Sequence, residues 1–158
     1  MSHTIPLTRE SYETLQEELK RLIREERPKV IQDIAEARSH GDLSENAEYD
    51  AAKNRQGFIE GRILELQGKL ARAHVVDLSG LKPDKVVFGS TVTLYDTATE
   101  EEVTYKIVGE DEADIKLGKI SCSSPVGKAL IGHKLDASVT VKVPSGTKEY
   151  EVIDIKYE

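Results

Sequence analysis

The chain has 158 residues, of which 38% are hydrophobic and 32% are charged, and its formal net charge is −7. This length suits one domain or two small ones, and the chain lacks the run of about 18 apolar residues that a membrane span needs. An acidic protein is a poor candidate for binding nucleic acid by itself, because Lys and Arg supply most of the affinity for phosphate. Cys122 is the single cysteine, which excludes an internal disulfide, and the four scattered histidines show no metal-ligand spacing. We therefore expect a cytoplasmic protein with no membrane partner.

The first part of the chain predicts a long helix that begins after Thr8, a residue suited to the N-cap position. Apolar residues recur at helical spacing, first at Tyr12, Leu15, Leu19 and Leu22, and then in a shifted register at Ile23, Val30, Ile34 and Ala37. Pro28 lies between the two registers and lacks a backbone donor. We expect it to bend or locally disturb the helix.

A second helix is predicted by apolar residues in a 3–4 repeat, which is the spacing of a coiled-coil seam. They are Ala52, Ile59, Ile63, Leu66, Leu70 and Ala73. A short break at residues 40–43 joins the two helices, and their equal lengths favour an antiparallel coiled-coil hairpin over residues 1–76. An ordinary helix pair within a compact bundle is the alternative.

Residues 77–84 contain Ser-Gly and Lys-Pro and predict a linker. From residue 85 to residue 158 the apolar period changes to two, which is typical of strands. Ser124-Pro125 predicts the start of a short helix that runs through Leu130. A phase change between Val152 and Ile153 predicts a β-bulge or burial on both faces of the last strand. The predicted fold class is α+β with two domains: the helical hairpin, and an antiparallel sheet with one short helix.

Acidic side chains gather in the break between the helices. Asp42 and Glu45 are three residues apart, which puts both on one side of the tip. Carboxylate oxygens are ligands that Mg²⁺ prefers, and a carboxylate can also orient or deprotonate an attacking water. The same spacing is that of a capping box, in which both residues serve only the start of the second helix. Because two carboxylates cannot close a Mg²⁺ site, a partner would have to supply the other ligands.

Several motifs occur in one order along the chain: GDLSENAEYDAAK at 41–53, QGFIEGRI at 56–63, Arg27-Pro28, Phe88-Gly89, Thr91-Val92-Thr93, Ile107-Val108-Gly109, DEAD at 111–114, Ser124-Pro125 and Leu130-Ile131-Gly132. Over nearly its whole length the chain thereby resembles the Gre family of bacterial transcript cleavage factors. The resemblance implies that the hairpin enters the secondary channel of RNA polymerase.

In that family, acidic tip residues help to bind the second Mg²⁺ and position a water. Asp42 and Glu45 occupy the matching positions. The polymerase's own active site then hydrolyses the 3′ end of a backtracked RNA, and the released complex resumes elongation. The resemblance implies an accessory factor that is not itself an enzyme. It has no cofactor of its own, shares Mg²⁺ with the polymerase, and acts as a monomer.

Other residues near the tip have two possible roles each. Ser44, Asn46 and Tyr49 would support the tip, although Ser44 also suits a helix start and Tyr49 suits helix packing. Arg38 and Lys53 resemble the basic patch that such factors present to the RNA 3′ end. Their alternative role is to balance the charge of the neighbouring acids.

The second domain resembles the FKBP-like domain with which Gre factors dock at the rim of the channel. Ser123, Ser124 and Pro125 match the loop that contacts the polymerase there. At Ser123 the chain departs from the family, which usually has Asn or Asp. Ser124-Pro125 can start a helix and still take part in docking.

The sequence leaves three other functions open. A prolyl isomerase needs a pocket lined with aromatic rings, whereas the chain has no Trp and only Phe88 of its two Phe lies in the second domain. A Gre homologue that plugs the channel without promoting cleavage is a second alternative, and the Asp42–Glu45 pair favours cleavage over it. The third is a coiled-coil adaptor, for which the tip sequence has no role.

Overall fold

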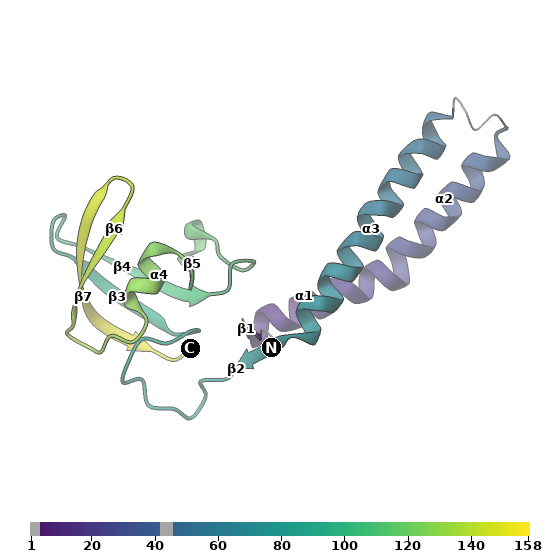
Figure 1. Ribbon diagram of the computed structural model, residues 1–158. Helices are drawn as coiled ribbons and strands as arrows, with labels where there is room; N and C mark the ends of the chain where they lie inside the picture. Colours follow the sequence, from purple (N-terminus) through teal and green to yellow (C-terminus); the bar gives the residue numbers. More distant parts are fainter. Residues whose placement is uncertain (1–3, 42–45) are drawn as a thin grey trace. The chain divides into compact units, whose positions relative to one another are not determined.

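The computed structural model describes residues 4–41 and 46–158 and divides into two compact units. The first unit contains Tyr12–Ala73 together with the start of the chain, and the second contains Pro6–Ser11 and His74–Glu158. The first is helical and the second is built on a sheet (Figure 1). The predicted α+β class with two domains is therefore confirmed.

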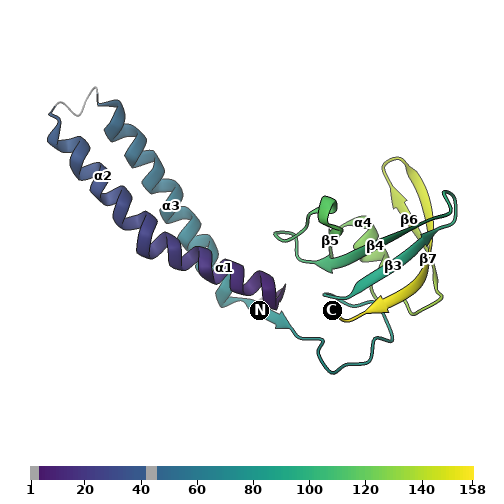
Figure 2. The ribbon, with the colours of Figure 1, turned by 180° about the vertical axis from the view of Figure 1, so that it is seen from behind.

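The first unit is a hairpin of two helical arms. The first arm runs without interruption through α1 (Arg9–Arg21), the segment η1 (Leu22–Glu26) and α2 (Arg27–Ser39), and the second arm is α3 (Ala47–Ala71). Figures 1 and 2 show α2 and α3 side by side from opposite directions. The side chains buried between the arms are Leu15, Leu22, Val30, Ile34 and Ala37 from the first arm, and Ala52, Ile59, Ile63 and Leu66 from the second.

The segment η1 is a π-helix, in which the amide of Arg27 donates to the carbonyl of Leu22. This hydrogen bond spans one more residue than that of an α-helix, and Arg27 and then Pro28 follow the segment. The predicted disturbance near Pro28 therefore takes the form of a wider turn. Sequence periodicity placed both Leu22 and Ile23 on the seam, and of these Leu22 is buried whereas Ile23 is half-buried. The extra residue sets Val30 eight positions after Leu22, where a heptad would give seven.

The second unit contains a five-stranded sheet in the order β5-β4-β3-β7-β6. Its strands are β3 (Thr91–Asp96), β4 (Glu101–Val108), β5 (Lys119–Ser121), β6 (Ser138–Val143) and β7 (Gly146–Lys156). Three of the neighbouring pairs are antiparallel, but β4 and β5 are parallel, so the sheet is mixed where a wholly antiparallel one was predicted. The register between β3 and β7 passes over Ile153, which confirms the predicted bulge.

The core of the second unit lies on one face of this sheet. Side chains buried there include Val92, Leu94, Ile107, Val141 and Val152. The short helix α4 (Pro125–Leu130) packs against β6 and adds Leu130 to the core, and a 3₁₀ turn, η3 (Ile115–Leu117), precedes β5. Helix α4 has the bounds that the sequence predicted.

Two short strands were not predicted. β1 (Ile5–Thr8) and β2 (Ala73–Val76) form a two-stranded sheet where the chain passes between the units. Residues 77–84 then run without helix or strand, and the carboxylate of Asp77 accepts hydrogen bonds from the amide and hydroxyl of Ser79. Across residues 4–41 and 46–158, each helix is too short or too polar to cross a lipid bilayer.

Truncation of the seam should destabilise the hairpin. Leu66 is 0% exposed on α3, whereas Leu64 on the same helix is 70% exposed. We expect Leu66→Ala to lower the free energy of unfolding by about 2–5 kcal/mol, because a buried leucine leaves a cavity. The matched variant Leu64→Ala should change it by less than about 0.5 kcal/mol. Thermal and urea unfolding followed by circular dichroism at 222 nm measures both values, and equal losses would contradict the assigned seam.

Candidate functional site at the hairpin tip

The two arms of the hairpin end on either side of the predicted acidic tip. α2 ends at Ser39, and His40 and Gly41 follow, with Gly41 in a left-handed conformation at φ 105°. α3 begins at Ala47, after Asn46. The predicted residues Asp42, Ser44 and Glu45 lie outside the residues that the structure describes, so their roles stay predictions.

Asn46 joins the two arms next to this segment. Its side-chain oxygen accepts a hydrogen bond from the amide of Tyr49 at 3.1 Å, so Asn46 is the N-cap of α3. Its side-chain nitrogen donates to the carbonyl of Ala37 on the opposite arm at 2.6 Å. The side-chain oxygen therefore caps the start of the second helix, and the side-chain nitrogen binds the end of the first helix.

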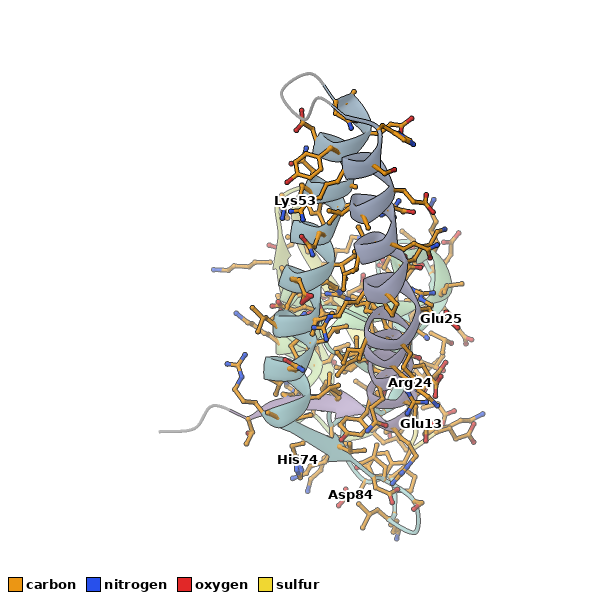
Figure 3. All side chains as sticks on the ribbon, turned by 90° about the vertical axis from the view of Figure 1, so that its right-hand side faces the viewer. Glu13, Arg24, Glu25, Lys53, His74 and Asp84 are labelled. Carbon is orange, nitrogen blue, oxygen red and sulfur yellow. The ribbon has the colours of Figure 1, made fainter. Side chains whose placement is uncertain are left out.

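The two predicted basic residues lie on opposite arms near the tip, and both are exposed. The guanidinium carbon of Arg38 lies 5.9 Å from the ring centre of Tyr49, a cation–π distance. Nζ of Lys53 donates to Oε1 of Gln56 at 3.2 Å, and Figure 3 shows Lys53 on the upper part of α3. Tyr49 thus serves as a platform for Arg38, a contact that sequence reasoning did not foresee.

Charged pairs connect the arms farther from the tip. Arg27 binds both carboxylate oxygens of Glu60 at 2.8 Å, and Arg62 binds both oxygens of Glu18 at 2.9 Å. Asp33 and Arg55 form a third pair between the arms. None of these pairs was predicted from the sequence, although opposite charges on both sides of a predicted seam were a usable signal.

The paired carboxylates titrate below their ordinary range. The hydrogen bond from Arg62 lowers the pKa of Glu18 from its usual 4.5, and the bond from Arg27 does the same for the pKa of Glu60. The pKa of Glu65 is also lowered, mainly by Lys69 and secondly by Arg62, both on the same helix. At neutral pH these three side chains are ionised and form fixed charge pairs.

The predicted docking loop belongs to the second unit. The hydroxyl of Ser124 accepts from the amide of Gly127 at 3.1 Å and donates to the carbonyl of Ser121 at 2.6 Å, so Ser124 caps α4. A Cβ atom at Gly127 would lie 2.2 Å from that carbonyl oxygen, so the close packing requires glycine. The hydroxyl of Ser123 donates to Oε1 of Glu110 at 2.6 Å, and both Ser123 and Pro125 are exposed. The helix-start role is confirmed, and docking stays a prediction.

A metal ion held by the chain alone would need three or more suitable side chains close together. Within residues 4–41 and 46–158 no such group of His, Cys, Asp or Glu exists. The two predicted tip carboxylates supply hard oxygen donors that fit Mg²⁺, but an octahedral ion needs more ligands than two. The pair could therefore contribute to a Mg²⁺ site only together with further ligands.

Residues 5–75 match the family description "Transcription elongation factor, N-terminal", and residues 81–157 match "Transcription elongation factor, GreA/GreB, C-term". The chain belongs to the GreA/GreB family of transcription elongation factors. The Gre resemblance in the sequence is thus confirmed, together with the predicted role in transcription elongation. This family is also one of accessory factors, as the sequence predicted.

Relatives of this GreA/GreB-family factor match it from end to end. It is 90% identical to "Transcription elongation factor GreA" of Trichlorobacter lovleyi and 89% identical to that of Pelobacter propionicus, each over 100% of both chains. A solved structure of "GreA factor homolog 1 (Gfh1)" of Thermus thermophilus is 30% identical, covers 97% of this chain and 99% of its own, and has a TM-score of 0.45.

Loss of the Asn46 side chain should loosen the start of α3. The variant Asn46→Ala removes both the cap and the bond to the carbonyl of Ala37. We expect a loss of about 0.5–2 kcal/mol in the free energy of unfolding, the usual range for an N-cap. Amide hydrogen exchange should speed up at Tyr49 and its neighbours. Asn54→Ala, an exposed change in the middle of α3, is the control and should leave that exchange unchanged.

The Arg62–Glu18 pair predicts a pH-dependent stability. Because the pKa of Glu18 is lower in the folded state, its contribution is present above about pH 4.5 and is lost as the pH falls through the folded pKa. Glu18→Gln should therefore be less stable than the parent at pH 7, by about 0.5–1 kcal/mol for a partly exposed pair. The difference should shrink as the pH falls through the lowered folded pKa of Glu18, because the carboxylate becomes protonated there. Urea unfolding at pH 7, 5 and 3 measures this convergence, and a constant difference would contradict it.

Proposed function

We propose that the factor binds RNA polymerase, inserts its hairpin into the secondary channel and stimulates cleavage of the 3′ end of backtracked RNA by the polymerase's own active site. The observation that supports this is a two-armed hairpin whose arms end at Ser39 and Ala47, on either side of Asp42 and Glu45. A narrow helical pair is a suitable carrier, because it exposes a terminal loop far from its base. In this proposal the factor works in the cytoplasm as a monomer.

The two tip carboxylates have complementary roles. Asp42 and Glu45 supply oxygen ligands and orient a water toward the scissile phosphodiester, and one carboxylate accepts the proton that this water loses. Together with ligands from the polymerase, the two carboxylates would hold a shared Mg²⁺ ion, which would supply neutralisation of the charge that develops during hydrolysis. Ser44 donates a hydrogen bond to phosphate or water. Asn46 and Tyr49 hold the ends of the loop through the contacts described above.

Two further groups of residues take part in the proposed complex. Arg38 and Lys53 lie near the RNA 3′ end, where a positive charge attracts the phosphate backbone. Stacking on Tyr49 limits the directions in which Arg38 can point. Ser123, Ser124 and Pro125 contact the rim of the channel. The cap at Ser124 and the bond from Ser123 to Glu110 hold that loop in one conformation.

The structure offers little support for prolyl isomerase activity. A cavity of about 240 Å³ in the second unit is lined by charged side chains that include Arg9, Glu10 and Lys106, and Tyr157 is the one aromatic residue among those that line it. With one aromatic residue, this lining lacks the rings that a prolyl isomerase pocket needs. Channel plugging without cleavage and a simple adaptor role predict no effect of the tip carboxylates on hydrolysis, so the same assay separates them from the proposal.

Removal of either tip carboxylate should abolish stimulated cleavage. We expect Asp42→Ala and Glu45→Ala to reduce the cleavage rate of a backtracked complex by about 100-fold or more, while the free energy of unfolding changes by no more than about 2 kcal/mol. Gel analysis of end-labelled RNA at saturating factor measures the rate. Glu13→Gln is the matched control, since Glu13 is an exposed carboxylate on α1 far from Lys53 along the hairpin (Figure 3).

The factor alone should not hydrolyse RNA, with or without Mg²⁺. Full activity in either tip variant would contradict the proposed roles, and so would cleavage in the absence of polymerase. Binding without cleavage by the unmodified factor would favour the channel-plugging alternative.

A further inference from the structure

The π-helical segment η1 is flanked by two charged pairs that join the arms. Glu18 precedes η1 on the first arm, and Arg27 follows it directly. Their partners, Arg62 and Glu60, are only two residues apart on α3. Each pair is bidentate, with both contacts at 2.8 Å for Arg27 and both at 2.9 Å for Arg62.

The two partners on α3 leave the helix on opposite sides of the seam. Successive residues turn by about 100°, so Glu60 and Arg62 are separated by about 200° around the axis. Ile59 and Ile63, which are 6% and 1% exposed, lie between these two directions. The first arm is therefore held on both sides of its apolar contact, at the place where its helical geometry changes.

A π turn is a place where a helix can change register. The extra residue can be accommodated at more than one position along the arm, because each position leaves most backbone hydrogen bonds intact. Moving it past a residue rotates that residue by about 100° and shifts it by about 1.5 Å along the axis. Arginine forks restrict such movement more strongly than single charge contacts, since both nitrogens must meet their oxygens together.

We propose that the Glu18–Arg62 and Arg27–Glu60 pairs lock the π turn in one position and thereby set the axial register of α2, the helix that leads to the tip. They are positioning residues, because they act on the tip through the arm. This inference rests on the proposed function only where it concerns cleavage. The register of the free hairpin is a separate property and is measured without polymerase.

The register can be measured as a distance between the arms beyond the π turn. Spin labels at Gln32 and Asn54, both exposed, report the relation of α2 to α3 once Cys122 is replaced by Ser. Pulsed electron paramagnetic resonance should give one narrow distance distribution for the otherwise unmodified hairpin. In Glu18→Gln/Glu60→Gln the distribution should broaden or gain a second component. The matched control is Glu65→Gln, because Glu65 pairs with Arg62 and Lys69 on its own helix.

The consequence for cleavage separates positioning from binding. At saturating factor, the double variant should cleave backtracked RNA about tenfold or more slowly, since displacement by about 1 Å is enough to disrupt a reacting geometry. The factor concentration at half-maximal rate should change by less than about threefold. A separate variant that exchanges the charges of the second pair, Arg27→Glu/Glu60→Arg, should keep both the narrow distribution and most of the rate.

An unchanged distance distribution in the double variant would overturn the inference, and so would a broadened distribution with an unchanged cleavage rate at saturation. Equal effects from Glu65→Gln would also overturn it, because that variant removes a paired carboxylate without breaking a link between the arms. If the unmodified factor stimulates no cleavage at all, the proposed function fails, and the distance measurement alone then decides the register.

Discussion

The apolar seam between the two arms is the contact on which the hairpin depends. A pair of helices buries only a narrow stripe of each, and within the described residues that stripe holds nine apolar side chains. Its fully buried members, such as Val30 and Leu66, exclude water along the whole contact. Because so little area is buried, each apolar side chain of the seam accounts for a large share of the contact. The charged groups beside the seam keep the remaining helix faces solvated.

The π segment lets the seam continue through a sequence that does not follow a regular repeat. Buried residues on the first arm are separated by seven residues from Leu15 to Leu22, then by eight from Leu22 to Val30. An uninterrupted α-helix with that spacing would turn Val30 away from Ile59 and its neighbours. One wide turn absorbs the extra residue, so both halves of the arm face α3. Because of this turn, the position of α2 along α3 depends on where the extra residue lies in the first arm.

Much of the fold could be predicted from the sequence because it follows from local patterns. The seam residues Ala52, Ile59, Ile63 and Leu66 are set by a repeat within one helix, and helix α4 is set by Ser124 and Pro125 at its start. The bulge at Ile153 was visible as a change of phase in a single strand. In each case, the prediction depends only on residues that are close together in the sequence.

The features that were missed depend on contacts between distant residues. The parallel pairing of β4 with β5, the strands β1 and β2, and the pairing of Arg62 with Glu18 join segments that lie far apart in the chain. From the sequence, a π turn could not be distinguished from a simple bend at Pro28. Both geometries accommodate a residue that has no backbone N–H to donate. At the tip, the family motif indicated Asp42 and Glu45, whereas spacing alone could not distinguish ligands from a capping box.

The loop that leads into α4 has lost most of its freedom before any partner arrives. The hydroxyl of Ser124 is bound to two backbone groups, Gly127 packs directly against the carbonyl of Ser121, and the Ser123 hydroxyl is tied to Glu110. Association normally costs entropy for each loop and side chain that must be ordered. A surface that contacted the exposed Pro125 would bind a loop that is already ordered, so the entropy cost of ordering this loop on binding would be small.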